Sequence, residues 1–167
     1  MRYQKRAILI TLLTLALPSA SDAGPLEDAR TAYLNRDFAT AYKIFRPLAD
    51  QGNAVAQTNL GVMYGGGEGV SQSFAEALKW FHKAADQGDA AAQYNLGLIY
   101  RDGKGVPRNY VLAYMWLDLS ASLFLPSSYE SRRSAYVARN FVAFKMTTTQ
   151  ITKAQKLVRE WKPKANQ

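Results

Sequence analysis

The chain has 167 residues, no cysteine, one histidine and a formal net charge of +8 at pH 7. The lack of cysteine excludes disulfide stabilisation and thiolate chemistry, and a single histidine cannot form a zinc site of the usual kind. With 48% hydrophobic residues the chain can bury an ordinary core, so we expect one domain held together by packing alone.

Residues 1–23 have the pattern of a secretory signal peptide. A basic start at Arg2, Lys5 and Arg6 precedes an apolar run over residues 7–17, and small residues lead up to Ala23. The apolar run is too short for a membrane span, which needs roughly 20 residues. We therefore expect cleavage near Ala23 and an exported chain, the alternative being a cytosolic protein with an apolar start.

Residues 24–52 predict a first helix pair, because two of its segments resemble segments found later in the chain. Residues 38–41 and 48–52 correspond to residues 74–77 and 84–88. Tyr33 lies 31 residues before its counterpart Tyr64, so the loop of this pair is five residues shorter than the later loops and lacks their Gly-x-Gly element.

Two repeats follow, at residues 53–88 and 89–124, with 13 of 36 positions identical. Repetition at this period is typical of helical repeat proteins. In the first repeat the apolar spacing predicts one helix over residues 54–64 and a second over about 73–87, separated by a glycine loop.

The glycines of the repeats predict two kinds of backbone. Those shared by both loops suggest positive φ, as does the glycine after the second helix; they are Gly67, Gly69, Gly103, Gly105 and Gly88. Gly61 and Gly97 instead fall inside helices, where glycine costs roughly 1 kcal/mol relative to alanine. We expect close approach to Ala77 and Ala113 to compensate for that cost.

The motifs of both repeats resemble the Sel1-like repeat, a subfamily of the tetratricopeptide helix-pair solenoids. They are Ala56-Gln57-Thr58-Asn59-Leu60-Gly61 with Tyr64, Gly67-Glu68-Gly69-Val70 and Ala75-Glu76-Ala77-Leu78-Lys79-Trp80, with counterparts at Ala92–Gly97, Gly103–Pro107 and Ala113–Trp116. The resemblance implies an all-α, right-handed helix-pair solenoid with a C-terminal helical cap, and it makes the periplasm the expected address.

Residues 125–167 are expected to form that cap. A helix is predicted over residues 129–144, and a second begins at Thr147, where Gln150 three residues later predicts a capping box. This segment carries nine Lys and Arg against two acidic residues, whereas residues 24–124 carry nine against ten. The excess positive charge either attracts an anionic surface or belongs to a solvated helix face.

By the same resemblance, the first helices of the repeats line a concave groove. The candidate binding residues are Asn59, Val62, Tyr94, Asn95, Leu98 and Arg101. In tetratricopeptide peptide clamps an asparagine at this position can bind the main chain of a ligand. The alternative is that Asn59 and Asn95 each bind a backbone group of the solenoid itself.

The expected function is an exported, non-enzymatic interaction or scaffold module that recognises a peptide or helix of a cell-envelope protein. We expect no cofactor, no metal and no nucleic acid as partner. His82 has no partner in sequence for nucleophilic or metal chemistry. Two alternatives remain: a small cell-wall hydrolase or β-lactam-binding protein, and a peripheral membrane protein that uses the helix over residues 148–161.

Overall fold

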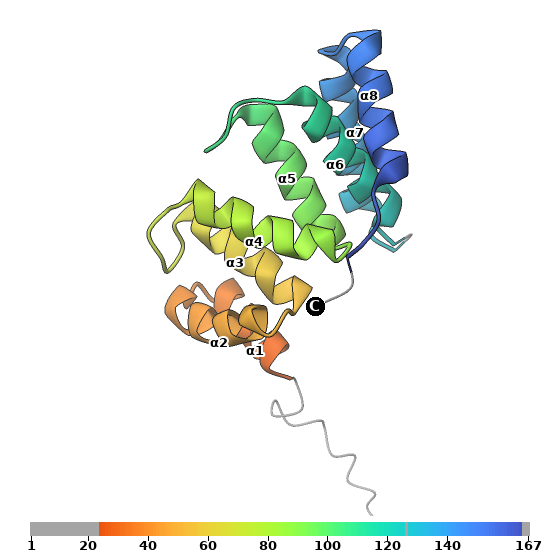
Figure 1. Cartoon of the computed structure of the whole chain (residues 1–167). Coiled ribbons are helices and arrows are strands. Elements are labelled where there is room, and N and C mark those ends of the chain that lie inside the picture. Colours follow the sequence, from red (N-terminus) through yellow and green to blue (C-terminus); the bar gives the residue numbers. More distant parts are fainter. Residues whose placement is uncertain (1–23, 126, 165–167) are drawn as a thin grey trace, which may run out of the picture.

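The computed structural model describes residues 24–125 and 127–164, and the predicted signal peptide lies outside them. These residues form an all-α fold (Figure 1). Its helices are α1 (Pro25–Leu34), α2 (Phe38–Asp50), α3 (Ala54–Gly66), α4 (Phe74–Asp86), α5 (Ala90–Asp102), α6 (Tyr110–Leu123), α7 (Tyr129–Phe144) and α8 (Thr148–Glu160). None of the helices within the described ranges is long and apolar enough to span a bilayer.

The helices α1 and α2, α3 and α4, and α5 and α6 pack as consecutive pairs that stack along one direction (Figure 1), and α7 and α8 both pack on α6. Across the stack α3 lies beside α5, and α5 lies beside α7, so the first helices of successive pairs are neighbours on one side. This arrangement confirms the predicted helix-pair solenoid.

Side-chain caps fix where the helices begin. Asn53, Ser73, Asp89 and Asn109 each precede a helix and accept a hydrogen bond from the backbone N–H three residues on. At α8 the predicted capping box is confirmed, because Thr147 and Gln150 bond each other's backbone N–H groups reciprocally. The loop glycines predicted to have positive φ do so, and Gly67 and Gly103 cap the ends of α3 and α5.

The helical glycines are sites of close packing, but not with the partners expected from the sequence. A Cβ on Gly61 would lie 2.5 Å from the ring of Phe81, and one on Gly97 would lie 2.5 Å from Cγ of Leu117. The expected approach to Ala113 is confirmed at Gly97, where its carbonyl oxygen lies 3.3 Å from the Cβ position, but the nearest atoms at both glycines belong to these larger side chains. The glycine makes room for a large side chain one turn farther along the second helix.

Buried glutamines join successive pairs. Gln57 donates to the carbonyl of Ala49, and its counterpart Gln93 donates to the carbonyl of Ala85, so each ties a first helix to the pair before it. Both side chains are at most 4% exposed. This polar contact recurs at the same offset as the sequence repeat.

The last two helices lie on different sides of α6. α7 packs on α6 through Ala135, Ala138 and Val142, all buried. From α8 and its C-cap, Leu157, Val158 and Trp161 pack against the core formed by α4, α5 and α6, while Ala154 joins the cluster between α6 and α7. The chain then returns to α4, where Lys164 bonds Asp86 through both its backbone N–H and its ammonium group, each at 2.7 Å. The C-terminal segment thus covers the outer side of the last repeat.

Candidate functional site

One hollow on the side of the first helices lies between α3 and α5. It has a volume of about 390 Å³. Four candidate residues line it together: Val62 from α3, and Asn95, Leu98 and Arg101 from α5. The three α5 residues point to the same hollow because residues three or four positions apart lie on one face of a helix.

One end of this hollow is closed by a half-buried tyrosine–carboxylate contact. The Tyr33 hydroxyl donates a 2.6 Å hydrogen bond to Oε2 of Glu68, which comes from the loop after α3. Burial, followed by the hydrogen bond to Glu68, raises the pKa of Tyr33 to about 12. The contact fixes the glycine loop against α1, so the N-terminal pair forms part of the groove wall, a role that the sequence did not indicate.

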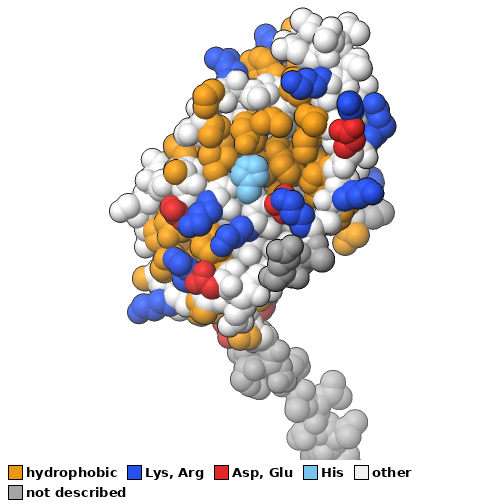
Figure 2. Space-filling view, viewed as in Figure 1, with side chains coloured by type: hydrophobic (Ala, Val, Ile, Leu, Met, Phe, Trp, Pro, Cys, Tyr) orange, Lys and Arg blue, Asp and Glu red, His pale blue; other side chains and the backbone are white. Residues whose placement is uncertain are grey.

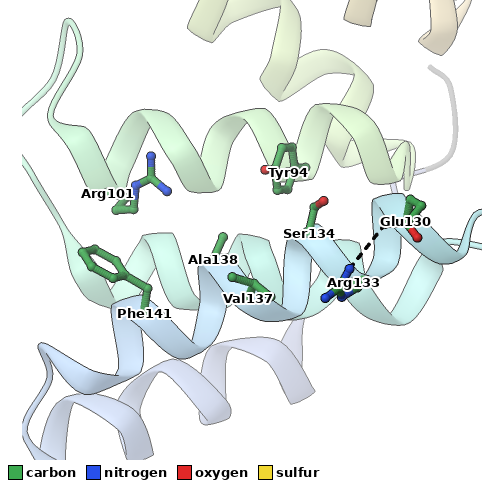
Figure 3. A pocket seen from close by; sticks show the side chains of 8 residues that line it. All are labelled: Tyr94, Arg101, Glu130, Arg133, Ser134, Val137, Ala138 and Phe141. Carbon is green, nitrogen blue, oxygen red and sulfur yellow. Dashed lines mark ion pairs between the residues drawn. The ribbon is translucent and has the colours of Figure 1, made fainter.

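A second hollow, of about 430 Å³, lies between α5 and α7 (Figure 3). Tyr94 and Arg101 come from α5, as predicted, and Val137 and Phe141 come from α7. Arg101 lines both hollows, so they adjoin at this side chain, and together they are called the groove across α3, α5 and α7. No α7 residue was predicted to line the groove, because this helix was expected to belong to the C-terminal cap. The available signal was the aromatic content of this segment, which has Tyr129, Tyr136, Phe141 and Phe144 within one predicted helix.

Arg101 is already paired within the groove. Its Nε and Nη2 atoms donate to the two carboxylate oxygens of Asp102, at 2.6 and 3.0 Å. The hydrogen bonds from Arg101 lower the pKa of Asp102 below its usual range. The guanidinium is thereby held in position, with further N–H groups available to an acceptor on a ligand.

The two asparagines adopt the same local structure. Nδ2 of Asn59 donates to the carbonyl of Val55 at 2.8 Å, and Nδ2 of Asn95 donates to that of Ala91 at 2.9 Å. In neither residue does Oδ1 take part in a hydrogen bond among the described residues. Of the two, Asn95 lines the groove between α3 and α5 and Asn59 lines neither hollow. Thr58, next to Asn59, is buried, and its hydroxyl donates to Asp89.

Comparison with known proteins agrees with this geometry. The family model for the Sel1 repeat matches residues 31–53, 54–89 and 90–123. The chain belongs to the Sel1 repeat family. Proteins of this family generally mediate protein–protein interactions and are usually not catalytic. Among curated proteins no match was found.

Two solved structures are similar to this Sel1 repeat protein. One is c5321, a protective antigen present in uropathogenic Escherichia coli strains, with 32% identity and a TM-score of 0.71 over 85% of this chain and 30% of that one. The other is a Sel1 repeat protein from Oxalobacter formigenes, with 25% identity and a TM-score of 0.65 over 81% of this chain and 55% of that one. The chain thus spans less than two thirds of either relative.

His82 of this Sel1 repeat protein lies away from the groove. Its Nε2 is 3.2 Å from the hydroxyl of Tyr100, and its ring meets those of Tyr100 and Trp116 edge to face. Figure 2 shows hydrophobic side chains above and beside the histidine and charged side chains below it. Burial lowers the pKa of His82, opposed by the charge of Asp86. Within the described ranges no group of three His, Asp or Glu side chains is placed to hold a metal ion.

Proposed function

We propose that this Sel1 repeat protein is an exported, periplasmic or secreted interaction module that binds a peptide or helix of a cell-envelope protein in the groove across α3, α5 and α7. One observation carries the proposal. Five of the six groove residues implied by the tetratricopeptide resemblance line two hollows that share Arg101.

The groove offers the contacts that a peptide segment requires. Val62 and Leu98 supply apolar surface, which provides affinity without strict direction. Oδ1 of Asn95 can accept from a ligand main-chain N–H, and the guanidinium of Arg101 can donate to a carbonyl or carboxylate. Because Nδ2 of Asn95 is held by its own helix, the acceptor points in a fixed direction and little side-chain entropy is lost on binding.

The alternatives have less support in the structure. His82 contacts aromatic rings rather than a nucleophile, which disfavours the hydrolase hypothesis. The apolar side of α8 packs against the core of the repeats, so its remaining surface offers polar and basic side chains such as Thr152, Lys153 and Lys156. Membrane binding through α8 would therefore rest on charge alone.

Affinity capture from an envelope extract tests the proposal. The chain from residue 24 is compared with Asn95→Ala/Leu98→Ser and with the matched surface control Leu34→Ser, whose side chain is 77% exposed on α1. We expect a specific protein to be retained by the unmodified chain and the control, and to fall about tenfold with the groove variant. Circular dichroism must be the same for all three. Equal retention by the groove variant, or no specific partner, would contradict groove recognition.

A further inference from the structure

Helix α7 is apolar on two opposite sides. Its inner side is buried against α6, and its outer side exposes large apolar residues over its whole length: Tyr129, Tyr136, Val137, Phe141 and Phe144, which are 40 to 83% exposed. Large apolar side chains that gather on one exposed side of a helix mark an interaction site. Among the described residues only the inner partner is present, so the outer side is a surface to be covered.

The shape of this outer side fits a helix better than a flat surface. A hollow of about 430 Å³ lies on the α5 side of a ridge formed by Arg133 and Val137, and another of about 420 Å³ lies on its far side, between Tyr129 and Asn140. A ridge flanked by two hollows matches the ridges and grooves by which helices pack. A bilayer would leave both hollows unfilled.

The position of α7 in the stack also indicates a helix. α5 lies beside α3, and α7 lies beside α5, so the far side of α7 is where the next first helix of a longer array would pack. In this chain that place is not taken by any described helix.

Charge indicates the chemistry of the partner. Arg132, Arg133 and Lys145 surround the exposed aromatic residues, and the ammonium of Lys145 lies 5.4 Å from the ring centre of Phe144. Glu130 is the only acidic residue of α7, and it is paired with Arg133 at 3.8 Å. Aromatic and arginine side chains are also enriched in the cores of protein interfaces. A complementary helix would carry carboxylates beside its apolar stripe.

We propose that the outer side of α7 is a second docking surface, which binds an amphipathic helix with acidic flanks from another protein as the next helix of the stack. This surface is defined by Tyr129, Arg132, Tyr136, Asn140 and Phe144, none of which lines the hollows between α3, α5 and α7. The hollow between α5 and α7 is shared with the proposed groove, so the variants that test this inference are placed at residues outside that groove.

A displayed peptide library tests this. The library consists of helix-forming peptides with Leu, Phe or Ala at apolar positions and Glu, Gln or Lys at flanking positions, selected against the chain from residue 24. We expect Glu-rich amphipathic peptides to be enriched, with binding that weakens as salt is raised. Binding should fall about tenfold with Tyr136→Ser/Phe144→Ser and with Arg132→Glu.

Matched controls separate this surface from the rest of the molecule. Lys153→Glu on α8 and Leu34→Ser on α1 should leave peptide binding unchanged. Leu98→Ser should also leave it unchanged, since a loss with Leu98→Ser alone would place the peptides in the groove and overturn the proposal. Thermal unfolding of each variant shows whether the fold is intact.

Other occupants are distinguished by two further measurements. Sedimentation with anionic phosphatidylglycerol vesicles that is abolished by Tyr136→Ser/Phe144→Ser, without peptide enrichment, would assign the surface to a membrane. A dimer in analytical ultracentrifugation that the same variant dissociates would assign it to a second copy of the chain. Enrichment of neutral or basic peptides, or none that depends on α7, would likewise overturn the proposal.

Discussion

Replacing Gly97 by alanine tests the close packing between α5 and α6. The new Cβ would lie 2.5 Å from Cγ and 2.8 Å from Cδ2 of Leu117, and 3.3 Å from the carbonyl oxygen of Ala113. Leu117 is fully buried and Cγ is its branch point, so the side chain cannot turn away without disturbing its neighbours. Relief of the clash therefore requires the two helices to move apart.

The expected cost follows from two opposing terms. Overpacking a well-packed core costs typically about 1–3 kcal/mol. Alanine recovers about 1 kcal/mol of helix propensity relative to glycine. Because the nearest atoms belong to a branch point and a backbone, we place the clash in the upper part of its range. We expect Gly97→Ala to lower the free energy of unfolding by about 1–2 kcal/mol, or the melting temperature by about 3–6 °C.

Urea titration and thermal unfolding followed by circular dichroism measure the effect. The matched control is Gly65→Ala on α3, where the nearest atom, Cβ of Ala77, lies at 3.7 Å and no loss is expected. In a Leu117→Ala background the clash is removed, so Gly97→Ala should reverse sign and stabilise by up to about 1 kcal/mol. A Gly97→Ala variant as stable as the unmodified chain would refute the argument for close helix approach.

Three more predictions concern single contacts. In the folded protein, burial lowers the pKa of His82 below its ordinary value of about 6.5. The stability associated with the neutral imidazole is therefore fully present above about pH 6.5 and is lost as the pH falls below that value. His82→Gln should remove this pH dependence of the melting temperature. In the first repeat, Nε2 of Gln87 donates to Oε1 of Gln57, whereas Oε1 of Gln93 is buried without a partner and the counterpart of Gln87 is Leu123. Leu123→Gln should therefore supply the missing donor and raise the free energy of unfolding by about 1 kcal/mol, as measured by urea titration. Gly105→Ala, at φ +72° with its Cβ 2.5 Å from that of Phe74, should destabilise by about 2–3 kcal/mol, measured in the same way.

Each of these has an internal check. The gain from Leu123→Gln should vanish in a Gln93→Ala background, since the new amide then has no acceptor to serve. A melting temperature of His82→Gln that keeps the full pH dependence of the unmodified chain between pH 7 and 5 would assign that dependence to other groups. An unaffected Gly105→Ala variant would contradict the tight contact between the loop and α4.

The helices could be predicted from the sequence where local signals agree. The predicted helix over residues 129–144 has the same bounds as α7, and the capping box at Thr147 is present. Apolar period, caps and loop glycines all point to the same structure there. The partners of Gly61 and Gly97 could not be predicted in this way, because they depend on how far one helix slides along another, which the period does not determine.

The site was predictable only in its first half. The repeat places Val62, Asn95, Leu98 and Arg101 on the same side of successive first helices, and they line one hollow. The second wall comes from α7, which does not repeat the motif, so no alignment within the chain could assign it. The closure of the groove by Tyr33 and Glu68 is likewise a contact between residues 35 apart with no sequence signal.

Three residues at each junction explain where the regular array ends. Gln51-Gly52-Asn53 and Gln87-Gly88-Asp89 join successive pairs, with glycine φ values of +93° and +91° and an Asn or Asp that caps the next helix. At the third junction the chain has Leu123-Phe124-Leu125, and Phe124 adopts φ −62° and ψ 130° instead of a left-handed turn. Without the glycine turn and the cap, the chain cannot start α7 as it starts α3 and α5. The same change of sequence removes the glutamine whose amide would donate to Oε1 of Gln93, and it leaves Leu123 and Leu125 exposed. The loss of the junction sequence therefore accounts both for the end of the repeat pattern and for the change in packing.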